Sequence, residues 1–237
     1  MENLLSNELL SRDGRSGYFY RILFIILIPI AQSIYFLINL TTTSASAHNV
    51  TIFLDKLIPF NEWFVIPYVF WYGYTFGALL LLAYFDHKTY YKLLFSIFIG
   101  MLVCFVIYLT YPSTVFRPEG IVPDNILKKT VLLIYSNDRP YNCLPSIHVL
   151  DTLLITMFLF KYNKSFLVKG SSAFICVLIY MSTLFIKQHS ILDAVASTIL
   201  GAILFYAFES EVIAKKLEDI RDAITRPKVK SSLSEDI

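Results

Sequence analysis

Six apolar stretches, each close to the length of a membrane-spanning helix, dominate this sequence of 237 residues. A helix needs roughly 20 mostly apolar residues to cross the hydrocarbon core of a bilayer. The stretches cover residues 19–40, 63–86, 90–111, 147–162, 167–186 and 190–209. Only 16% of the residues are charged, against about 25% in soluble domains, which agrees with an integral membrane protein. The sequence therefore predicts an all-α fold, a bundle of six transmembrane helices.

The distribution of lysine and arginine between the stretches predicts the orientation of the chain. With the N-terminus in the cytoplasm, fourteen of the twenty basic residues fall on the inner side. The other six are outside: Lys56, Arg117, Lys128, Lys129, Arg139 and Lys187. We expect both termini in the cytoplasm and the loop 112–146 outside, in a multi-pass protein of the cell membrane. The domains are then a cytoplasmic segment 1–18, a membrane domain 19–210 and a cytoplasmic tail 211–237.

Segments at the two ends of the membrane domain leave alternatives open. Ala45-Ser46-Ala47 is similar to a signal-peptide cleavage site, but the apolar run before it exceeds the usual length of roughly 7–15 residues. We therefore keep that run as the first helix. Residues 208–225 have helical apolar spacing, typical of a solvated or interfacial face. The last twelve residues are expected to be disordered.

Composition and cysteine spacing exclude several functional classes. A net charge of +2 is too small to favour nucleic-acid binding. Cys104, Cys143 and Cys176 are far apart in the sequence, so neither a zinc site nor a disulfide framework is expected. The sequence contains no internal repeat and no glycine-rich phosphate loop. We therefore expect one membrane domain without a metal or a cofactor, and the oligomeric state stays open.

Chemically active residues gather at the predicted outer face. His148 and His189 lie at the outer ends of the fourth and sixth stretches, and Asp193 follows His189 by one helical turn. A carboxylate in that position fixes the imidazole tautomer and raises the basicity of the other ring nitrogen. The alternative is an ordinary helix start, in which Asp193 satisfies free amides of the first turn. His48 and His87 are expected to be solvated surface residues.

A helix start and three cations at the same face predict an anion site. Ser146 is the expected N-cap of the fourth stretch, so its hydroxyl and the free amides of the first turn would point at an anion. Phosphate fits such a terminus, and the outer segments supply its counter-charges, Arg117, Arg139 and Lys187. A histidine that attacks phosphorus and another that protonates the leaving oxygen would complete a phosphoryl transfer.

Two motifs carry a resemblance to a known family. PSIH (145–148), followed forty-one residues later by HSILD (189–193), resembles the second and third motifs of the type 2 phosphatidic acid phosphatase superfamily, related to vanadium haloperoxidases. Arg117-Pro118 resembles the end of its first motif. The contexts YNCLPSIH and STLFIKQHSILD are closer to the branch that contains inositol phosphorylceramide synthases. The resemblance covers about residues 110–200.

This resemblance implies a role for each matched residue. His189 would be the nucleophile that forms a phosphohistidine, and Asp193 would orient it. His148 would protonate the leaving alkoxide and later help to activate the acceptor. Arg117, Ser146 and the amides next to it would hold the phosphate oxygens. The resemblance implies that no metal is required.

Two cations of the family motifs are missing from this chain. Thr110 stands where the first motif has lysine, and Thr183 stands where the third has arginine. Lys187, two residues before the nucleophile, and Arg139, seven before Ser146, are the replacements that we infer on charge grounds. An inactive relative of the family therefore stays an alternative.

Three functions remain under consideration. We expect a membrane lipid phosphate phosphatase that acts on phosphomonoester or pyrophosphate lipids, phosphatidate-like or isoprenoid-like, so that its partners are a lipid phosphate and the bilayer. Discharge of the same phosphohistidine by an inositol or lipid hydroxyl would instead make the chain a phosphotransferase. A transporter would spread ionisable residues through the depth of the spans, whereas only Asp151 and Asp193 lie about one turn deeper than the others.

Overall fold

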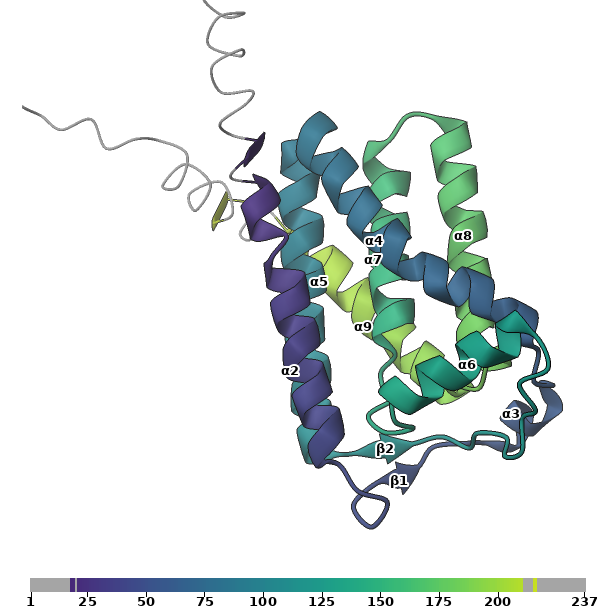
Figure 1. Ribbon diagram of the computed structural model, residues 1–237. Helices are drawn as coiled ribbons and strands as arrows, with labels where there is room; N and C mark the ends of the chain where they lie inside the picture. Colours follow the sequence, from purple (N-terminus) through teal and green to yellow (C-terminus); the bar gives the residue numbers. More distant parts are fainter. Residues whose placement is uncertain (1–17, 20, 211–214, 217–237) are drawn as a thin grey trace, which may run out of the picture.

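The computed structural model describes residues 18–19, 21–210 and 215–216. The predicted segment 1–18 lies almost entirely outside the described residues, as do the predicted disordered end and most of the predicted amphipathic tail. The described chain forms a bundle of helices with a small cap at one end (Figure 1).

Six long helices make up the bundle, and shorter elements connect them. The long helices are α2 (Leu27–Thr41), α4 (Val65–Phe85), α5 (His87–Thr110), α7 (Ile147–Tyr162), α8 (Phe166–Phe185) and α9 (Ile191–Glu209). The connecting elements are β1 (His48–Asn49), α3 (Phe53–Leu57), the 3-10 helix η1 (Glu62–Phe64), β2 (Ser113–Thr114) and α6 (Ile126–Asn137). β1 and β2 pair in parallel, with His48 opposite Ser113.

Within the described residues, five helices are long and apolar enough to cross a membrane. They cover Arg21–Thr41, Glu62–Phe85, His87–Thr110, Phe166–Phe185 and Ile191–Glu209. Five of the six predicted spans are thus confirmed in length and composition. The fourth stretch forms α7, which has 16 residues and packs against α4, α5, α8 and α9 in the middle of the bundle. That the fourth stretch also crosses the membrane, as a sixth span, remains a prediction. The sides on which the termini lie also remain predictions.

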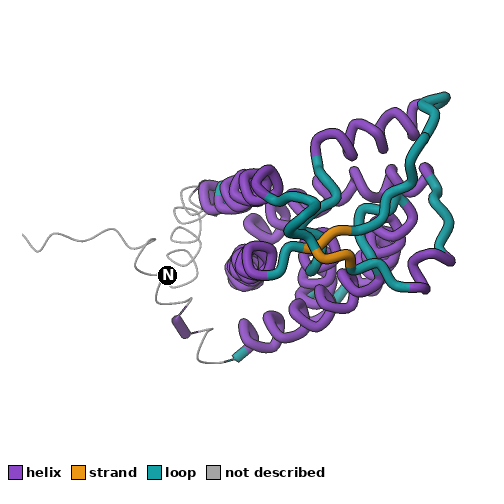
Figure 2. Tube along the Cα trace, turned by 90° about the horizontal axis from the view of Figure 1, so that it is seen from below, coloured by secondary structure: helices purple, strands orange, loops and turns teal. Residues whose placement is uncertain are grey.

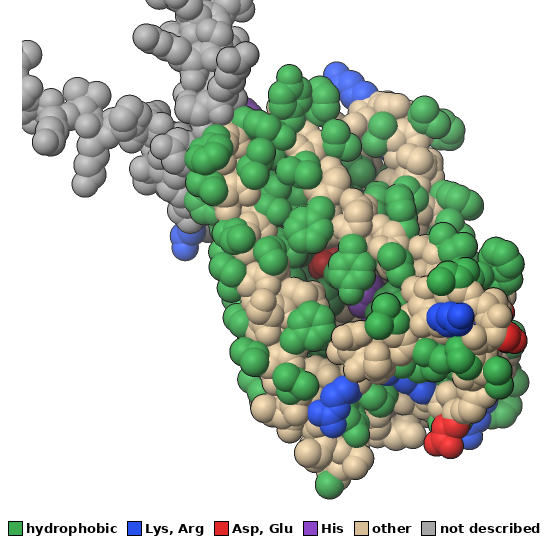
Figure 3. All heavy atoms as spheres, viewed as in Figure 1, with side chains coloured by type: hydrophobic (Ala, Val, Ile, Leu, Met, Phe, Trp, Pro, Cys, Tyr) green, Lys and Arg blue, Asp and Glu red, His purple; other side chains and the backbone are tan. Residues whose placement is uncertain are grey.

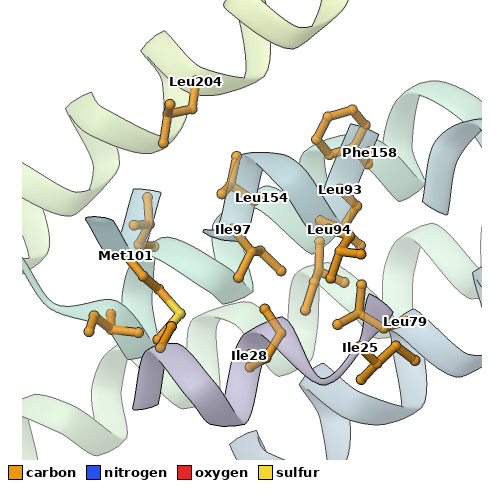
Figure 4. Packing of buried hydrophobic residues seen from close by; sticks show 14 of the residues in the cluster. Ile25, Ile28, Leu79, Leu93, Leu94, Ile97, Met101, Leu154, Phe158 and Leu204 are labelled. Atoms are coloured by element: carbon orange, nitrogen blue, oxygen red, sulfur yellow. The ribbon is translucent and has the colours of Figure 1, made fainter. Parts of the chain in front are cut away.

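The core of the bundle forms where α7 meets its neighbours (Figure 4). Leu154 and Phe158 of α7 are fully buried and belong to a cluster that extends over α2, α4, α5 and α9. Figure 4 shows, among others, Ile28, Leu79, Leu93, Leu94, Ile97, Met101 and Leu204. Many large apolar side chains are exposed on the outside of the helices, as an environment of lipid tails requires (Figure 3).

Two glycines let α5 and α9 approach α7 closely. A Cβ on Gly100 would lie 2.8 Å from Leu150 Cδ2 and 3.0 Å from Leu204 Cδ1. A Cβ on Gly201 would lie 2.9 Å from Leu153 Cδ2. Small residues at helix contacts allow such close packing in membrane proteins. The packing holds α7, the helix whose first turn carries His148.

The cap lies at the end of the bundle where α4, α7 and α9 begin (Figure 1), and its strands lie near the middle of the end view (Figure 2). It contains α6, which we expected only as part of an outer loop. Asn125 starts α6, because its side chain accepts a hydrogen bond from the amide of Lys128 at 2.9 Å. Leu127, Val131 and Ile134, at helical spacing, pack towards the start of α4. Both signals were present in the sequence.

Candidate active site

His189 directly precedes α9, whose first turn holds it in place. Ser190 and Asp193 form a capping box: the Ser190 amide donates to Asp193 Oδ2 at 2.8 Å and the Asp193 amide donates to Ser190 Oγ at 3.3 Å. His189 Nδ1 lies 3.3 Å from Asp193 Oδ2 and 3.0 Å from the Cys143 carbonyl oxygen. Asp193 therefore does both of the things that the sequence offered as alternatives: it caps the helix and it contacts the imidazole.

The contacts of His189 define its tautomer. Both partners of Nδ1, a carboxylate and a carbonyl oxygen, are acceptors, so Nδ1 carries the hydrogen in the neutral ring. The lone pair then resides on Nε2. The side chain of Asp193 is fully buried and that of His189 is 10% exposed, so the carboxylate contacts the ring from the protein interior. This is the arrangement that a nucleophilic imidazole needs.

His148 is the second residue of α7 and lies against aromatic side chains of α4. Its ring centroid lies 4.5 Å from that of Tyr68 and 4.2 Å from that of Trp71. The His189 ring centroid is 5.6 Å away. Neither nitrogen of His148 has a hydrogen-bond partner in the described part of the chain. The aromatic contacts thus position the ring and leave its nitrogens available, a role that the sequence did not reveal.

Ser146 is the N-cap of α7, as predicted. Its hydroxyl oxygen accepts a hydrogen bond from the amide of Val149 at 3.4 Å. Its carbonyl accepts from Ser197 Oγ at 2.9 Å, and its amide donates to the Asp193 carbonyl at 3.5 Å. These hydrogen bonds connect the starts of α7 and α9, and Ser146 is fully buried between them. Whether it also contacts phosphate stays a prediction.

Arg117 lies beside the residue that precedes His189. One terminal nitrogen donates to Gln188 Oε1, and the other donates to the Asp138 carbonyl at 2.8 Å. The guanidinium also lies over the Tyr135 ring, 4.3 Å from its centroid. Nε is buried and has no partner among the described residues. The structure therefore brings this predicted cation to residues 186–190, between α8 and α9, which we call the nucleophile loop after the role expected for His189. Contacts with α6 and its C-terminal end hold Arg117 there.

Lys187 lies in the same loop and lines the same cavity as His189. Its Nζ donates to the carbonyl oxygens of Asp55, at 2.9 Å, and of Ile58. Burial lowers the pKa of Lys187, and the charge of Asp55 opposes that effect. A lysine ammonium has three donors, so one stays available for a ligand.

Arg139 is not brought to the histidines, in contrast to the group of cations that we expected. Its guanidinium donates to the carbonyl oxygens of Asn39, at 3.4 Å, and Leu40, at 3.1 Å, near the C-terminal end of α2. It also lies over the Tyr141 ring. The carbonyl oxygens at a helix C-terminus carry partial negative charge, which explains the attraction.

The two threonines that stand in place of motif cations have structural contacts. The Thr110 hydroxyl donates to the Val106 carbonyl of its own helix at 2.8 Å. The Thr183 carbonyl accepts from the amides of Gln188, at 3.0 Å, and His189, at 3.1 Å. Thr183 thus shapes the nucleophile loop through its backbone.

A cavity of about 650 Å³ opens onto His189. Its lining combines polar residues with apolar ones: Asn49, Thr51, Asp55, Lys56, Ile58, Pro59, Phe60, Val115, Phe116, Pro118, Lys187, His189 and Ser190. The segment between β1 and η1 forms one wall, which sequence reasoning missed because no motif marks it. Asp55 holds that wall, since its carboxylate accepts from the amides of Ile52 and Ile191, both at 2.8 Å.

Three potential metal ligands meet behind His189. Cys143 Sγ, a ring nitrogen of His189 and a carboxylate oxygen of Asp193 lie within 4.8 Å of one another. A metal would need the thiolate and a His189 nitrogen free of hydrogen. Burial raises the pKa of Cys143, and Nδ1 of His189 faces two acceptors. The donor set therefore fits a hydrogen-bonded histidine better than a metal site.

A family model described as the PAP2 superfamily matches residues 46–207. The chain belongs to the PAP2 superfamily. The matched range begins after α2 and contains His148, His189 and Asp193, which confirms the resemblance found in the motifs. Membership in this superfamily supports a phosphatase-type enzyme of the membrane. The closer likeness to the inositol phosphorylceramide synthase branch remains a prediction.

Two further comparisons carry no argument about this membership. The crystal structure of Aquifex aeolicus LpxE has 18% sequence identity and a TM-score of 0.47, over 75% of this chain and 93% of that chain. This likeness is too distant to transfer a substrate or a residue role. No match was found among curated proteins.

Proposed function

We propose that this chain is a multi-pass membrane lipid phosphatase that hydrolyses phosphomonoester or pyrophosphate lipids through a phosphohistidine on His189, without a metal. The observation that carries the proposal is the geometry of His189. Asp193 and the Cys143 carbonyl hold Nδ1, and the residue lines a cavity that also contains Lys56 and Lys187. A phosphate in that cavity would meet a nucleophile on one side and cations on the other.

The first step transfers the phosphoryl group to the enzyme. The Nε2 lone pair of His189 bonds to phosphorus while the bond from phosphorus to the lipid oxygen breaks. His148, 5.6 Å away between ring centroids, gives its proton to that oxygen, so the lipid alcohol leaves neutral. Arg117, Lys187 and the amides of the nucleophile loop are proposed to stabilise the charge on the phosphoryl oxygens.

The second step returns the enzyme to its starting state. Water attacks the phosphohistidine, neutral His148 accepts a proton from that water, and the bond between phosphorus and Nε2 breaks. Inorganic phosphate leaves and His148 is protonated again. A hydroxyl acceptor in place of water would yield the phosphotransferase reaction, and nothing else in the cycle would change.

The test uses the purified full chain in detergent micelles with phosphatidate as substrate. We expect phosphate release in the presence of EDTA, inhibition by vanadate, and a radiolabelled protein adduct that acid, but not alkali, hydrolyses. Products formed with and without inositol separate hydrolysis from transfer. Activity that EDTA abolishes and a divalent ion restores would refute the metal-free mechanism, and would direct attention to the Cys143 ligand set.

A further inference from the structure

Four buried side chains on α4 and α7 carry polar atoms without a partner in the described part of the chain. They are Trp71 through Nε1, Thr75 through Oγ1, His148 through both ring nitrogens and Asp151 through both carboxyl oxygens. Their exposures are 4%, 2%, 9% and 0%, respectively. Buried polar atoms almost always have a hydrogen-bond partner, so six such atoms on two packed helices call for a partner that the described part of the chain does not supply.

These side chains are arranged in two successive turns. The rings of Trp71 and His148 lie 4.2 Å apart, which fixes the contact between α4 and α7. Thr75 is one turn further along α4, and Asp151 is one turn further along α7. Both helices begin at the capped end of the bundle (Figure 1), so Thr75 and Asp151 are further from the cap along their helices than Trp71 and His148. The proposed mechanism uses His148 and leaves Trp71, Thr75 and Asp151 without a role.

A second cavity, of about 280 Å³, reaches this group from the side of the bundle. It lies between α2 and α4 and is lined by Ile28, Pro29, Gln32, Ser33, Phe36, Trp71, Tyr72, Thr75 and Phe76. In Figure 3 the apolar face over α2 and α4 is hollowed, with acidic and histidine atoms visible at the bottom. Trp71 and Thr75 thus line this cavity, and Trp71 also contacts His148.

We propose that this second cavity binds the lipid alcohol of the substrate, and that Trp71, Thr75 and Asp151 recognise a free hydroxyl next to the phosphate ester. The inference rests on the proposed function and specifies its substrate class: lipid phosphates with a second hydroxyl, such as monoacylglycerol phosphates. His148, which gives its proton to the departing alcohol, lies between this cavity and His189.

The chemistry of the unpartnered atoms selects a hydroxyl. The Trp71 N–H is only a donor, and a hydroxyl oxygen accepts from it. A carboxyl group either accepts from a hydroxyl or donates to it, depending on protonation, so Asp151 is satisfied in both forms. A phosphate would instead find no cation among the residues that line this cavity. Apolar walls from Ile28, Phe36 and Phe76 suit the alkyl part of the same molecule.

The kinetic test compares two substrates that differ by one hydroxyl, 1-oleoylglycerol 3-phosphate and 3-(oleoyloxy)propyl phosphate. We expect kcat/KM to favour the first about tenfold or more, since the second leaves buried polar atoms unpaired. Asp151→Leu and Thr75→Val, which keep the branching and the number of heavy atoms of the side chains they replace, should remove most of that preference. Thr198→Val changes a helical threonine that bonds to its own helix at Ala194, and the preference should persist.

A second readout does not depend on turnover. In the His189→Ala background, a cysteine at Ser33, an exposed residue that lines the cavity, is labelled with a maleimide. 1-Oleoylglycerol should slow the labelling more than 3-hydroxypropyl oleate, and Thr75→Val should equalise the two. Protection with no phosphate release by the wild type would reject the phosphatase and retain the alcohol site. Equal kinetics for both substrates, or an unchanged preference in Asp151→Leu and Thr75→Val, would overturn the hydroxyl site.

Discussion

The imidazole rings of His148 and His189 lie with their centroids 5.6 Å apart and their planes at 59°, although forty-one positions separate them in the sequence. Each ring is held by contacts of its own. Tyr68 and Trp71 pack against His148, and Asp193 with the Cys143 carbonyl contacts His189. A phosphate ester between the rings would have a nucleophile and a proton donor at its two ends.

The two histidines should differ in their dependence on the leaving group. His189→Ala should abolish phosphate release from phosphatidate and from p-nitrophenyl phosphate, because both need the nucleophile. His148→Ala should lower kcat about 100- to 10,000-fold for phosphatidate, yet far less for p-nitrophenyl phosphate, whose leaving group needs no proton. His48→Ala, on an exposed histidine of β1, is the matched control. Equal losses for both substrates in His148→Ala would argue against an acid role.

Asp193 and Ser190 separate orientation of the nucleophile from capping of α9. Asp193→Asn should lower kcat about 10- to 100-fold, because the amide orients and polarises His189 less well than a carboxylate. Ser190→Ala should cost about 1 kcal/mol of stability while the carboxylate of Asp193 stays in place. Thermal unfolding and kcat are measured for both variants. A Ser190→Ala variant as slow as Asp193→Asn would show that catalysis depends only on the helix start.

Arg117 and Arg139, in the segment between α5 and α7, should respond differently to substitution. Arg117→Ala should raise KM and weaken vanadate inhibition, because its guanidinium lies next to Gln188 in the nucleophile loop. Arg139→Ala should leave both values nearly unchanged and lower thermal stability, since its contacts are carbonyls of α2. Similar rises in KM for both variants would indicate that Arg139 also binds the phosphate of the substrate.

The pH dependence of activity should report on Lys187. Burial lowers its pKa from the ordinary value of 10.5, so the cation that we propose attracts phosphate is present at lower pH and is lost as pH rises through that reduced value. We expect kcat/KM to fall on the alkaline side accordingly. Lys187→Arg should move the fall to higher pH, and Lys187→Met should remove it and raise KM. An unchanged alkaline limb in Lys187→Met would assign the titration to another group.

The predicted orientation can be tested by cysteine labelling in intact cells. A cysteine at exposed Glu119 should react with a membrane-impermeant maleimide, whereas one at exposed Lys164 should react only after permeabilisation. The three native cysteines are buried and supply a low background. The reverse pattern would place the active site on the cytoplasmic side.

The sequence by itself determined the elements of this protein whose causes lie in neighbouring residues. Apolar runs of sufficient length predicted the long helices. Ser146 marked the start of α7, and the spacing of His189 and Asp193 predicted that their side chains meet, although His189 lies just before α9 and not on it. The short motifs also carried the family, which the match over residues 46–207 confirms. The helix start at Ser146 and the contact between His189 and Asp193 depend on hydrogen bonds between residues that are close in the sequence.

Only the tertiary structure decided which distant side chains meet. It placed Arg117 at the nucleophile loop and Arg139 at the end of α2, although both lie in the segment between α5 and α7. It brought Trp71 against His148 and set Asp55 beneath the start of α9. These contacts join residues about 70 to 140 positions apart, and they depend on how the helices pack. No local pattern of charge or hydrophobicity encodes that packing.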